Sequence, residues 1–269
     1  MREFLRDLLP PIVARAYRSA AGRAFSFRGD YASWEAARAA SSGYDAAEIL
    51  DRTREAALKV KRGEARMDRD AVAFDRMEYP FAVLAGLLRA ACVKKGSLAV
   101  LDIGGAFGNS YRQVRAFTAR PALRWNVVEQ PALVASAREH FESEELRFFP
   151  GVAEALAAGP ADVVLLSSAL QYFEKPYALL EGLGKIDAAA LIIDRTPCSD
   201  AERDVLAVQT VPAEIYSGSY PCWIFSRRKL EAALAMRYAV VAAFGDPAGP
   251  QRSDCGAFEL QGYVLDRRN

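Results

Sequence analysis

The sequence is poor in the residues that most often build metal and redox centres. It has one histidine and four cysteines among 269 residues. The cysteines, Cys92, Cys198, Cys222 and Cys255, are scattered along the chain without a close pair. Such spacing fits neither a disulfide framework nor a zinc site and is typical of a reducing compartment. We therefore expect no metal site and a cytoplasmic location.

Excess charge of one sign and long apolar runs are also missing. Thirty-five basic and 34 acidic residues leave a formal net charge of +1, whereas a nucleic-acid-binding domain usually carries a strongly basic face. We thus expect no nucleic-acid partner. No apolar run reaches the ~18–20 residues that a membrane helix needs. Arg6, Asp7, Pro10 and Pro11 interrupt the first apolar stretch, so a secretion signal is not expected either.

The first 28 residues leave two interpretations open. Six arginines alternate there with Leu, Ile, Val and Phe. This pattern is typical of a solvated amphipathic helix, and it also fits a helix that lies on a membrane surface. The second interpretation would place the protein at the inner face of the membrane.

The residue pattern changes near residue 97. Residues 1–95 are rich in Ala, Arg and Glu at helical spacing, except around 25–43, where Ser33 is a plausible N-cap. Beyond this point short apolar runs alternate with helical stretches, which predicts an α/β fold with a parallel sheet. We expect a helical segment over 1–95 and a Rossmann-like domain over 96–269. Its seven strands should lie near 98–103, 125–129, 145–149, 162–167, 189–194, 237–244 and 257–265.

A glycine-rich bend follows the first of these strands. Residues 98–101 are apolar, Asp102 follows, and Gly104, Gly105 and Gly108 lead into a helical pattern that starts near Ser110. Glycines allow backbone N–H groups to approach a ligand closely, and a helix N-terminus adds positive dipole. The bend therefore predicts a nucleotide-like ligand, with an ordinary turn as the alternative.

The details of the bend disfavour a dinucleotide. Ala106 and Asn109 stand where the dinucleotide fingerprint has its second and third glycines. A carboxylate at Asp102 would also repel a diphosphate. Glu129 ends the next predicted strand, where nucleotide-binding α/β folds hold ribose hydroxyls. Pro131 then suits the first position of a helix.

Residues 100–108, Val-Leu-Asp-Ile-Gly-Gly-Ala-Phe-Gly, resemble motif I of the class I S-adenosylmethionine-dependent methyltransferases, with Ala106 in place of the usual middle glycine. Further stretches, at 27–34, 42–45, 69–75, 209–216 and 219–226, are similar to a poorly characterised bacterial family that accompanies surface-polysaccharide and O-antigen genes. The resemblance implies a seven-stranded methyltransferase sheet, S-adenosylmethionine as cofactor and S-adenosylhomocysteine as product. It also implies a small-molecule or glycan acceptor, with O-methylation of a sugar as the expected reaction.

The resemblance and the strand ends together nominate the site residues. Ligands of doubly wound sheets lie at the carboxyl ends of the strands. We expect the cofactor to be bound by Asp102, Gly104, Gly105, Ala106, Gly108, Glu129, Gln130, Val152, Ser167 and Ser168. We expect the acceptor to be bound by Gln171, Arg195, Gln209, Tyr216 and Tyr220.

A hydroxyl acceptor needs a group that takes its proton. The only histidine, His140, falls on the helix after the second strand, away from the acceptor side, so we expect it to be structural. Catalytic candidates are Asp194, Glu174 and Tyr172, with Asp70 as a further one. Two of these have a structural alternative: Tyr172 as a core aromatic, and Asp194 as the ion-pair partner of Arg195.

Two other functions remain open from the sequence. The missing catalytic histidine and Ala106 fit a protein that binds the cofactor but acts as a regulatory or partner subunit. A nicotinamide-dependent oxidoreductase on a related sheet is the other alternative, and Asp102 and Asn109 disfavour it.

Overall fold

The computed structural model describes residues 25–42, 47–93, 96–118, 122–247 and 249–268. The hypothesis of a membrane-surface helix concerns residues 1–28 and therefore falls almost wholly outside the described residues, as does most of the stretch 42–45. Within the described ranges, no helix combines the length and the apolar character needed to cross a membrane.

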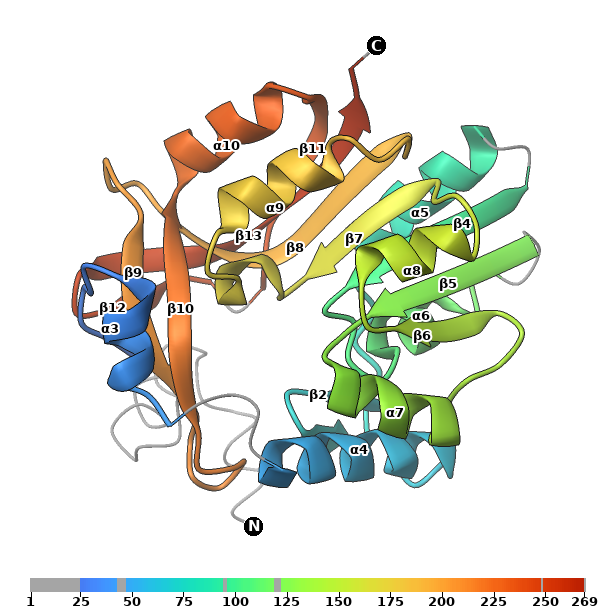
Figure 1. Cartoon of the computed structure of the whole chain (residues 1–269), viewed down its shortest axis with the longest axis horizontal. Helices are drawn as coiled ribbons and strands as arrows, with labels where there is room; N and C mark the ends of the chain where they lie inside the picture. Colours follow the sequence, from blue (N-terminus) through green and yellow to red (C-terminus); the bar gives the residue numbers. More distant parts are fainter. Residues whose placement is uncertain (1–24, 43–46, 94–95, 119–121, 248, 269) are drawn as a thin grey trace.

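Five parallel strands form the centre of the sheet (Figure 1). In spatial order they are β6 (Leu146–Phe149), β5 (Ala122–Val128), β4 (Ser97–Ile103), β7 (Val163–Ser167) and β8 (Ala190–Ser199). Antiparallel strands β13 (Gly256–Arg267) and β11 (Tyr238–Gly245) extend it beyond β8. These seven strands lie where the sequence predicts them, and the Rossmann-like α/β fold is confirmed.

The sheet is nevertheless larger than predicted, with eleven strands among the described residues. β8 continues past the end of β7, and its last residues pair with β10 (Ser219–Ser226). β9 (Val205–Thr210) and β1 (Ser26–Arg28) follow in antiparallel order, and β12 (Gln251–Ser253) pairs with β13. β9 and β10 form the wall at the left of Figure 1.

The N-terminal segment is therefore not purely helical, which corrects the sequence prediction. Besides β1, it contains a separate hairpin of β2 (Met67–Arg69) and β3 (Val72–Phe74). Its helices are α3 (Trp34–Ala39), α4 (Ala47–Lys61) and α5 (Phe81–Val93). Ser33 caps α3 as predicted, because its Oγ accepts a hydrogen bond from the N–H of Ala36 at 3.2 Å.

Helices cover both faces of the central sheet. One apolar core joins α5, α6 (Asn109–Val114) and α7 (Pro131–His140) to inward-facing residues such as Val100 and Trp125. A second core joins α8 (Val152–Ala157), α9 (Pro176–Leu183) and α10 (Arg227–Ala235) to the opposite face, through residues such as Leu101. Side chains alternate between faces along a strand, so both faces of β4 are buried. Pro131 opens α7 as predicted.

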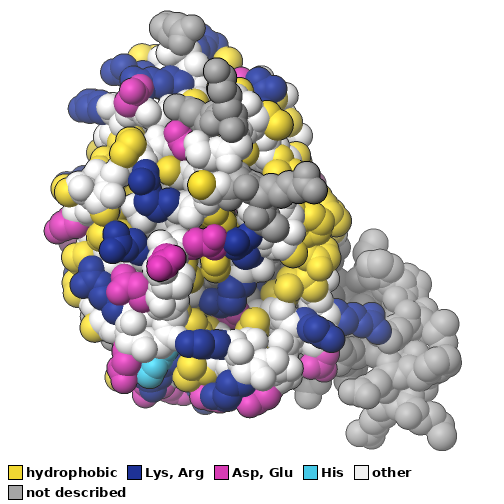
Figure 2. Space-filling model, turned by 90° about the vertical axis from the view of Figure 1, so that its right-hand side faces the viewer, with side chains coloured by type: hydrophobic (Ala, Val, Ile, Leu, Met, Phe, Trp, Pro, Cys, Tyr) yellow, Lys and Arg dark blue, Asp and Glu magenta, His cyan; other side chains and the backbone are white. Residues whose placement is uncertain are grey.

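Basic and acidic side chains are interspersed over the face that Figure 2 shows. Hydrophobic side chains gather along its right-hand edge. Neither sign of charge forms a continuous patch on that face.

Candidate functional site

The predicted glycine bend joins β4 to α6 at the carboxyl edge of the sheet. Gly104 and Gly108 have φ angles of +73° and +84°, in the left-handed region that favours glycine. A Cβ at Gly104 would also lie only 2.8 Å from the Cβ of Ala169. Both glycines are thus required for the course of the backbone, and β4 is brought close to the chain that follows β7.

Ala106 adopts the same left-handed conformation, with φ +48°, although it carries a side chain. This conformation costs an L-residue roughly 1–2 kcal/mol. The N–H of Ala106 donates to Glu129 Oε1 at 3.2 Å. The loop therefore keeps its bend with alanine at this position. The hydrogen bond to Glu129, the residue just after β5, holds Ala106 in this conformation.

Glu129 follows β5, and one of its two carboxylate oxygens holds the loop. Oε2 accepts a hydrogen bond from the N–H of Gln130 at 3.0 Å, while Oε1 accepts that of Ala106. Burial raises the pKa of Glu129, although the two backbone hydrogen bonds work in the opposite direction. A carboxylate offers about four lone-pair sites, so two further donors have room to bind. Gln130 is exposed at the N-cap of α7, and Val152 opens α8 after β6.

Asp102 lies beneath the loop and is completely buried. The indole N–H of Trp125 donates to its Oδ2 at 2.9 Å, and Oδ1 has no hydrogen-bond partner among the described residues. A Cβ at Gly105 would lie 2.4 Å from that Oδ2. Burial, reinforced by the nearby charge of Glu129, raises the pKa of Asp102 to about 7. Its position corrects the expectation of a direct cofactor contact: Asp102 supports the loop from below.

A β-bulge lies at the far side of the site, in β8. The β13 residue Gln261 pairs with Thr196 and Tyr263 pairs with Ile193, so Asp194 and Arg195 together face the single residue Gly262. Arg195 has a φ of +50°. Successive strand residues normally point to opposite faces, and a bulge redirects side chains locally. Both Asp194 and Arg195 therefore line one cavity.

Asp194, Arg195 and Ser167 form a closed set of contacts. Ser167 Oγ donates to Asp194 Oδ2 at 2.9 Å, and Arg195 Nη2 donates to Ser167 Oγ at 3.1 Å. Arg195 Nε lies 3.5 Å from the same Oδ2. The ion pair that the sequence left as an alternative is thus present, and it is part of the cavity wall.

The cavity has a volume of about 880 Å³. It brings together much of the predicted set: Ser167, Ser168, Gln171, Tyr172, Asp194, Arg195, Gln209 and Asp70. Sequence reasoning missed other lining residues, among them Arg69, Glu78, Tyr79, Phe81, Phe244 and Asp246. Ser110 and Gln113 of α6 also line it, so the cavity adjoins the helix that follows the glycine loop.

Gln171 and Tyr172, two polar residues that line the cavity, differ in their hydrogen bonding. Gln171 is 2% exposed, its Nε2 donates to Ser168 Oγ at 3.3 Å, and its Oε1 has no hydrogen-bond partner among the described residues. A buried carbonyl oxygen without a partner is costly, and a ligand donor would satisfy it. The Tyr172 hydroxyl instead donates to Gln209 Oε1 at 3.0 Å.

Some predicted residues lie elsewhere. Glu174 is no longer a catalytic candidate, which corrects the sequence prediction. Its side chain is exposed, lies 3.8 Å from Lys175 Nζ and does not line the cavity. Tyr216 and Tyr220 are buried behind the cavity wall with their hydroxyls 3.3 Å apart. Both therefore pack the wall and do not reach the cavity. His140 sits at the end of α7 and is likewise not among the lining residues.

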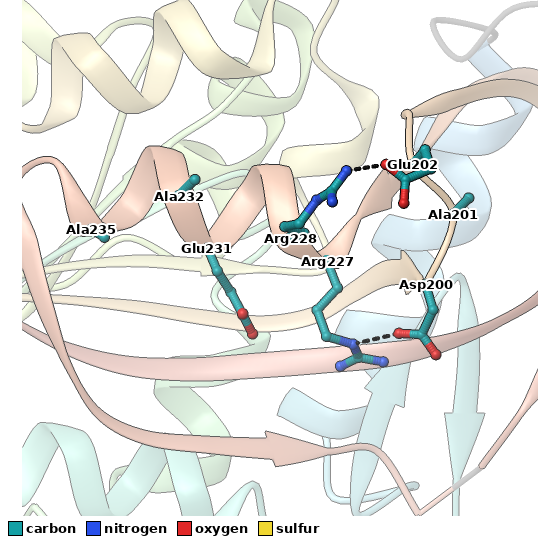
Figure 3. Close-up of a pocket in the computed structure, with 8 residues that line it drawn as sticks. All are labelled: Asp200, Ala201, Glu202, Arg227, Arg228, Glu231, Ala232 and Ala235. Atoms are coloured by element: carbon teal, nitrogen blue, oxygen red, sulfur yellow. Dashed lines mark hydrogen bonds and ion pairs between the residues drawn. The ribbon is translucent and has the colours of Figure 1, made fainter.

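A second hollow, of about 500 Å³, lies beside α10 (Figure 3). Its charged side chains already have partners. Arg227 Nε pairs with Asp200 Oδ1 at 3.1 Å and Arg228 pairs with Glu202, while Glu231 accepts a hydrogen bond from the Tyr263 hydroxyl at 3.0 Å. No predicted site residue lines it. The larger cavity next to the glycine loop is therefore the candidate site.

No protein-family model matches the sequence, and no curated protein matches it. Among solved structures, the N-terminal domain of EvdMO1, in the presence of S-adenosylhomocysteine (SAH) and D-fucose, is 17% identical with a TM-score of 0.47. The match covers 84% of this chain and 98% of that one. At this identity and TM-score, the function has to be inferred from the chain's own residues.

Two further structures are similar at the same level. The Burkholderia thailandensis 1,6-didemethyltoxoflavin-N1-methyltransferase, with bound 1,6-didemethyltoxoflavin and SAH, is 16% identical with a TM-score of 0.43, over 85% of this chain and 95% of that one. The mitomycin 7-O-methyltransferase MmcR is 18% identical with a TM-score of 0.41, over 83% and 69%.

Proposed function

We propose that this protein is an S-adenosylmethionine-dependent methyltransferase that methylates a hydroxyl group of a sugar or another small acceptor. One observation carries the proposal. A left-handed glycine loop is held by Glu129 at the tip of the neighbouring strand, and the helix that follows this loop contributes Ser110 to a cavity lined by Asp194, Arg195 and Gln171. The role in surface-glycan synthesis rests on the sequence resemblance.

The charges at the loop favour this cofactor over a dinucleotide. Glu129 has room to accept two ribose hydroxyls, and Asp102 places a second carboxyl group under the same loop. Above about pH 7, where it is ionised, Asp102 opposes a diphosphate and favours a ligand with a positive centre, whereas Glu129 can hold a ribose of either cofactor. When bound, S-adenosylmethionine supplies a methyl group that its sulfonium activates for transfer. The loop residues bind it, and Ser167 and Ser168 border its reactive end.

The cavity residues then orient the acceptor and receive its proton. Gln171 Oε1 accepts a hydrogen bond from one acceptor hydroxyl, and the Asp194 carboxylate, held by Ser167 and Arg195, takes the proton from the hydroxyl that is methylated. Positioning of this kind can lower a barrier by about 7–11 kcal/mol. The N-terminal segment supplies the acceptor side, since Phe25, Asp70 and Tyr79 line the cavity.

Titration calorimetry with SAH tests the cofactor half of the proposal. We expect Glu129→Gln to weaken binding by a factor of at least about ten, ~1.4 kcal/mol, because the loop and the ribose both lose an anionic acceptor. Glu139→Gln is the matched control, since Glu139 is exposed on the same helix that Glu129 precedes. Absence of SAH binding to the wild type would overturn the proposal.

Transfer of a labelled methyl group to nucleotide-linked sugars tests the acceptor half. Asp194→Asn should slow transfer by about 10²–10⁴ while SAH affinity is retained. SAH binding without transfer to any of these sugars would contradict the sugar acceptor and favour the cofactor-binding partner protein instead.

A further inference from the structure

Arg112 of α6 connects the glycine loop with the β2–β3 hairpin. Its Nη1 donates to the carbonyl oxygen of Phe107, in the loop, at 2.6 Å. Its Nη2 donates to Asp68 Oδ1, in the hairpin, at 2.6 Å. Asp68 is only 3% exposed, and the Arg112 side chain 17%. Breaking such a buried pair leaves an uncompensated charge, so loop and hairpin are strongly held together.

Further contacts fasten the first strand of the hairpin to the same helix. Asn109 Nδ2 donates to the carbonyl oxygen of Asp68 at 3.3 Å, and Asn109 Oδ1 accepts a bond from Arg112 Nη2 at 2.9 Å. Gln113 Nε2 lies 2.9 Å from the sulfur of the buried Met67. Two consecutive residues of β2, Met67 and Asp68, are thus bound to α6.

The other end of the hairpin reaches the acceptor cavity. Asp70 and Ala71 form its two-residue turn with φ angles of +51° and +62°. Two left-handed residues in succession are the signature of a type I′ turn, which usually contains glycine. Backbone strain of this kind persists where the surrounding structure holds it and is common at functional sites. Asp70 and Arg69 both line the cavity.

We propose that Arg112 is a positioning residue that couples the cofactor loop to the hairpin, so that an occupied loop holds Asp70 at the acceptor cavity. The inference rests on the proposed function, because the ligand of the loop is taken to be the methyl donor or its product. Opening of the hairpin breaks the Asp68–Arg112 pair and removes a support from the carbonyl of Phe107. Coupling between two sites is reciprocal, so a ligand that requires the closed loop also stabilises the hairpin. Cofactor binding then strengthens acceptor binding, and acceptor binding strengthens cofactor binding by the same factor.

Hydrogen–deuterium exchange with and without SAH tests this coupling. Residues 103–110 report on the loop and residues 66–75 on the hairpin. Ligand at about 100 times its dissociation constant shifts a coupled opening equilibrium by up to about 100-fold. We expect exchange in the wild-type hairpin to slow by at least about tenfold on SAH binding, and by less than about twofold in Arg112→Met.

Two further variants separate coupling from simple loss of structure. Asp68→Asn keeps the shape of the side chain and should also abolish the SAH-dependent protection of the hairpin, which covers the case that Arg112→Met does not fold. Arg115→Met is the matched control, because Arg115 is next to the same helix but pairs with Glu145 at 2.7 Å. It should keep the protection, and Arg112→Lys should restore part of it.

The outcomes are distinguishable. Protection of the loop without protection of the hairpin in the wild type overturns the coupling and leaves the proposed function standing. Equal SAH-dependent protection of the hairpin in wild type and Arg112→Met overturns the role of Arg112. No protection of either segment by SAH overturns the proposed function, and the coupling with it.

Discussion

Replacing Asp102 by asparagine should change how stability depends on pH. Burial raises the pKa of Asp102 from 3.8 in the unfolded chain to about 7 in the folded protein. Between these values the folded protein holds a proton that the unfolded chain has lost, so stability falls as pH rises. The stability that the protonated, buried Asp102 contributes is fully present below pH 3.8 and is lost as pH rises through about 7. A shift of about three units at 1.36 kcal/mol each amounts to about 4 kcal/mol, of which about 3 kcal/mol falls between about pH 5 and pH 8.

Urea unfolding of wild type and Asp102→Asn across this range measures the effect. Asparagine does not ionise and keeps an oxygen for the Trp125 indole, so we expect the variant to gain about 3 kcal/mol relative to wild type from about pH 5 to pH 8. Asp187→Asn, at an exposed position, should show a constant difference. If the stability difference between Asp102→Asn and wild type changes by less than about 0.5 kcal/mol from about pH 5 to pH 8, the raised pKa of Asp102 and the dry environment under the loop are refuted.

Three further substitutions test the loop and its surroundings. Gly105→Ala should lower the free energy of unfolding by about 1–3 kcal/mol, since its Cβ would lie 2.4 Å from Asp102 Oδ2; an unchanged urea midpoint would show that this carboxyl group moves freely. Ala106→Gly should raise the free energy of unfolding by about 0.5–1 kcal/mol by relieving its left-handed φ, and a decrease in urea unfolding would contradict that strain. His140→Gln should leave SAH affinity unchanged within about twofold, because His140 does not line the cavity; a large loss in calorimetry would return the histidine to the site.

The central sheet and the cofactor loop could be predicted because their signals are local. Most of the seven strands contain a short apolar run. Asp102 is the last residue but one of β4, and the glycines and Glu129 directly follow strand ends. The strand β10 and the extension of β8 were missed for a physical reason. Pro197 and Pro221 lie inside these strands, and proline normally argues against an interior strand.

The arrangement of the cavity depends on contacts between distant parts of the chain. The bulge that brings Asp194 and Arg195 to one side is set by the register with β13 around Gly262, which no local pattern reveals. The hairpin of Asp70 is joined to the loop and its helix through Arg112 and Asn109, which are distant from it in sequence. Glu174 illustrates the opposite error, because it lies in the segment after β7, at a strand end where a ligand is expected. The chain becomes extended at Phe173 and carries Glu174 to the surface.

The central claim is that the loop between β4 and α6 binds S-adenosylmethionine rather than a dinucleotide. Parallel calorimetric titrations of the wild-type protein with SAH and with NAD test it most directly. We expect micromolar binding of SAH. Asp102 under the loop, together with Ala106 and Asn109 in place of two glycines of the dinucleotide fingerprint, predicts at least about tenfold weaker binding of NAD, ~1.4 kcal/mol. Tighter binding of NAD than of SAH would contradict the claim.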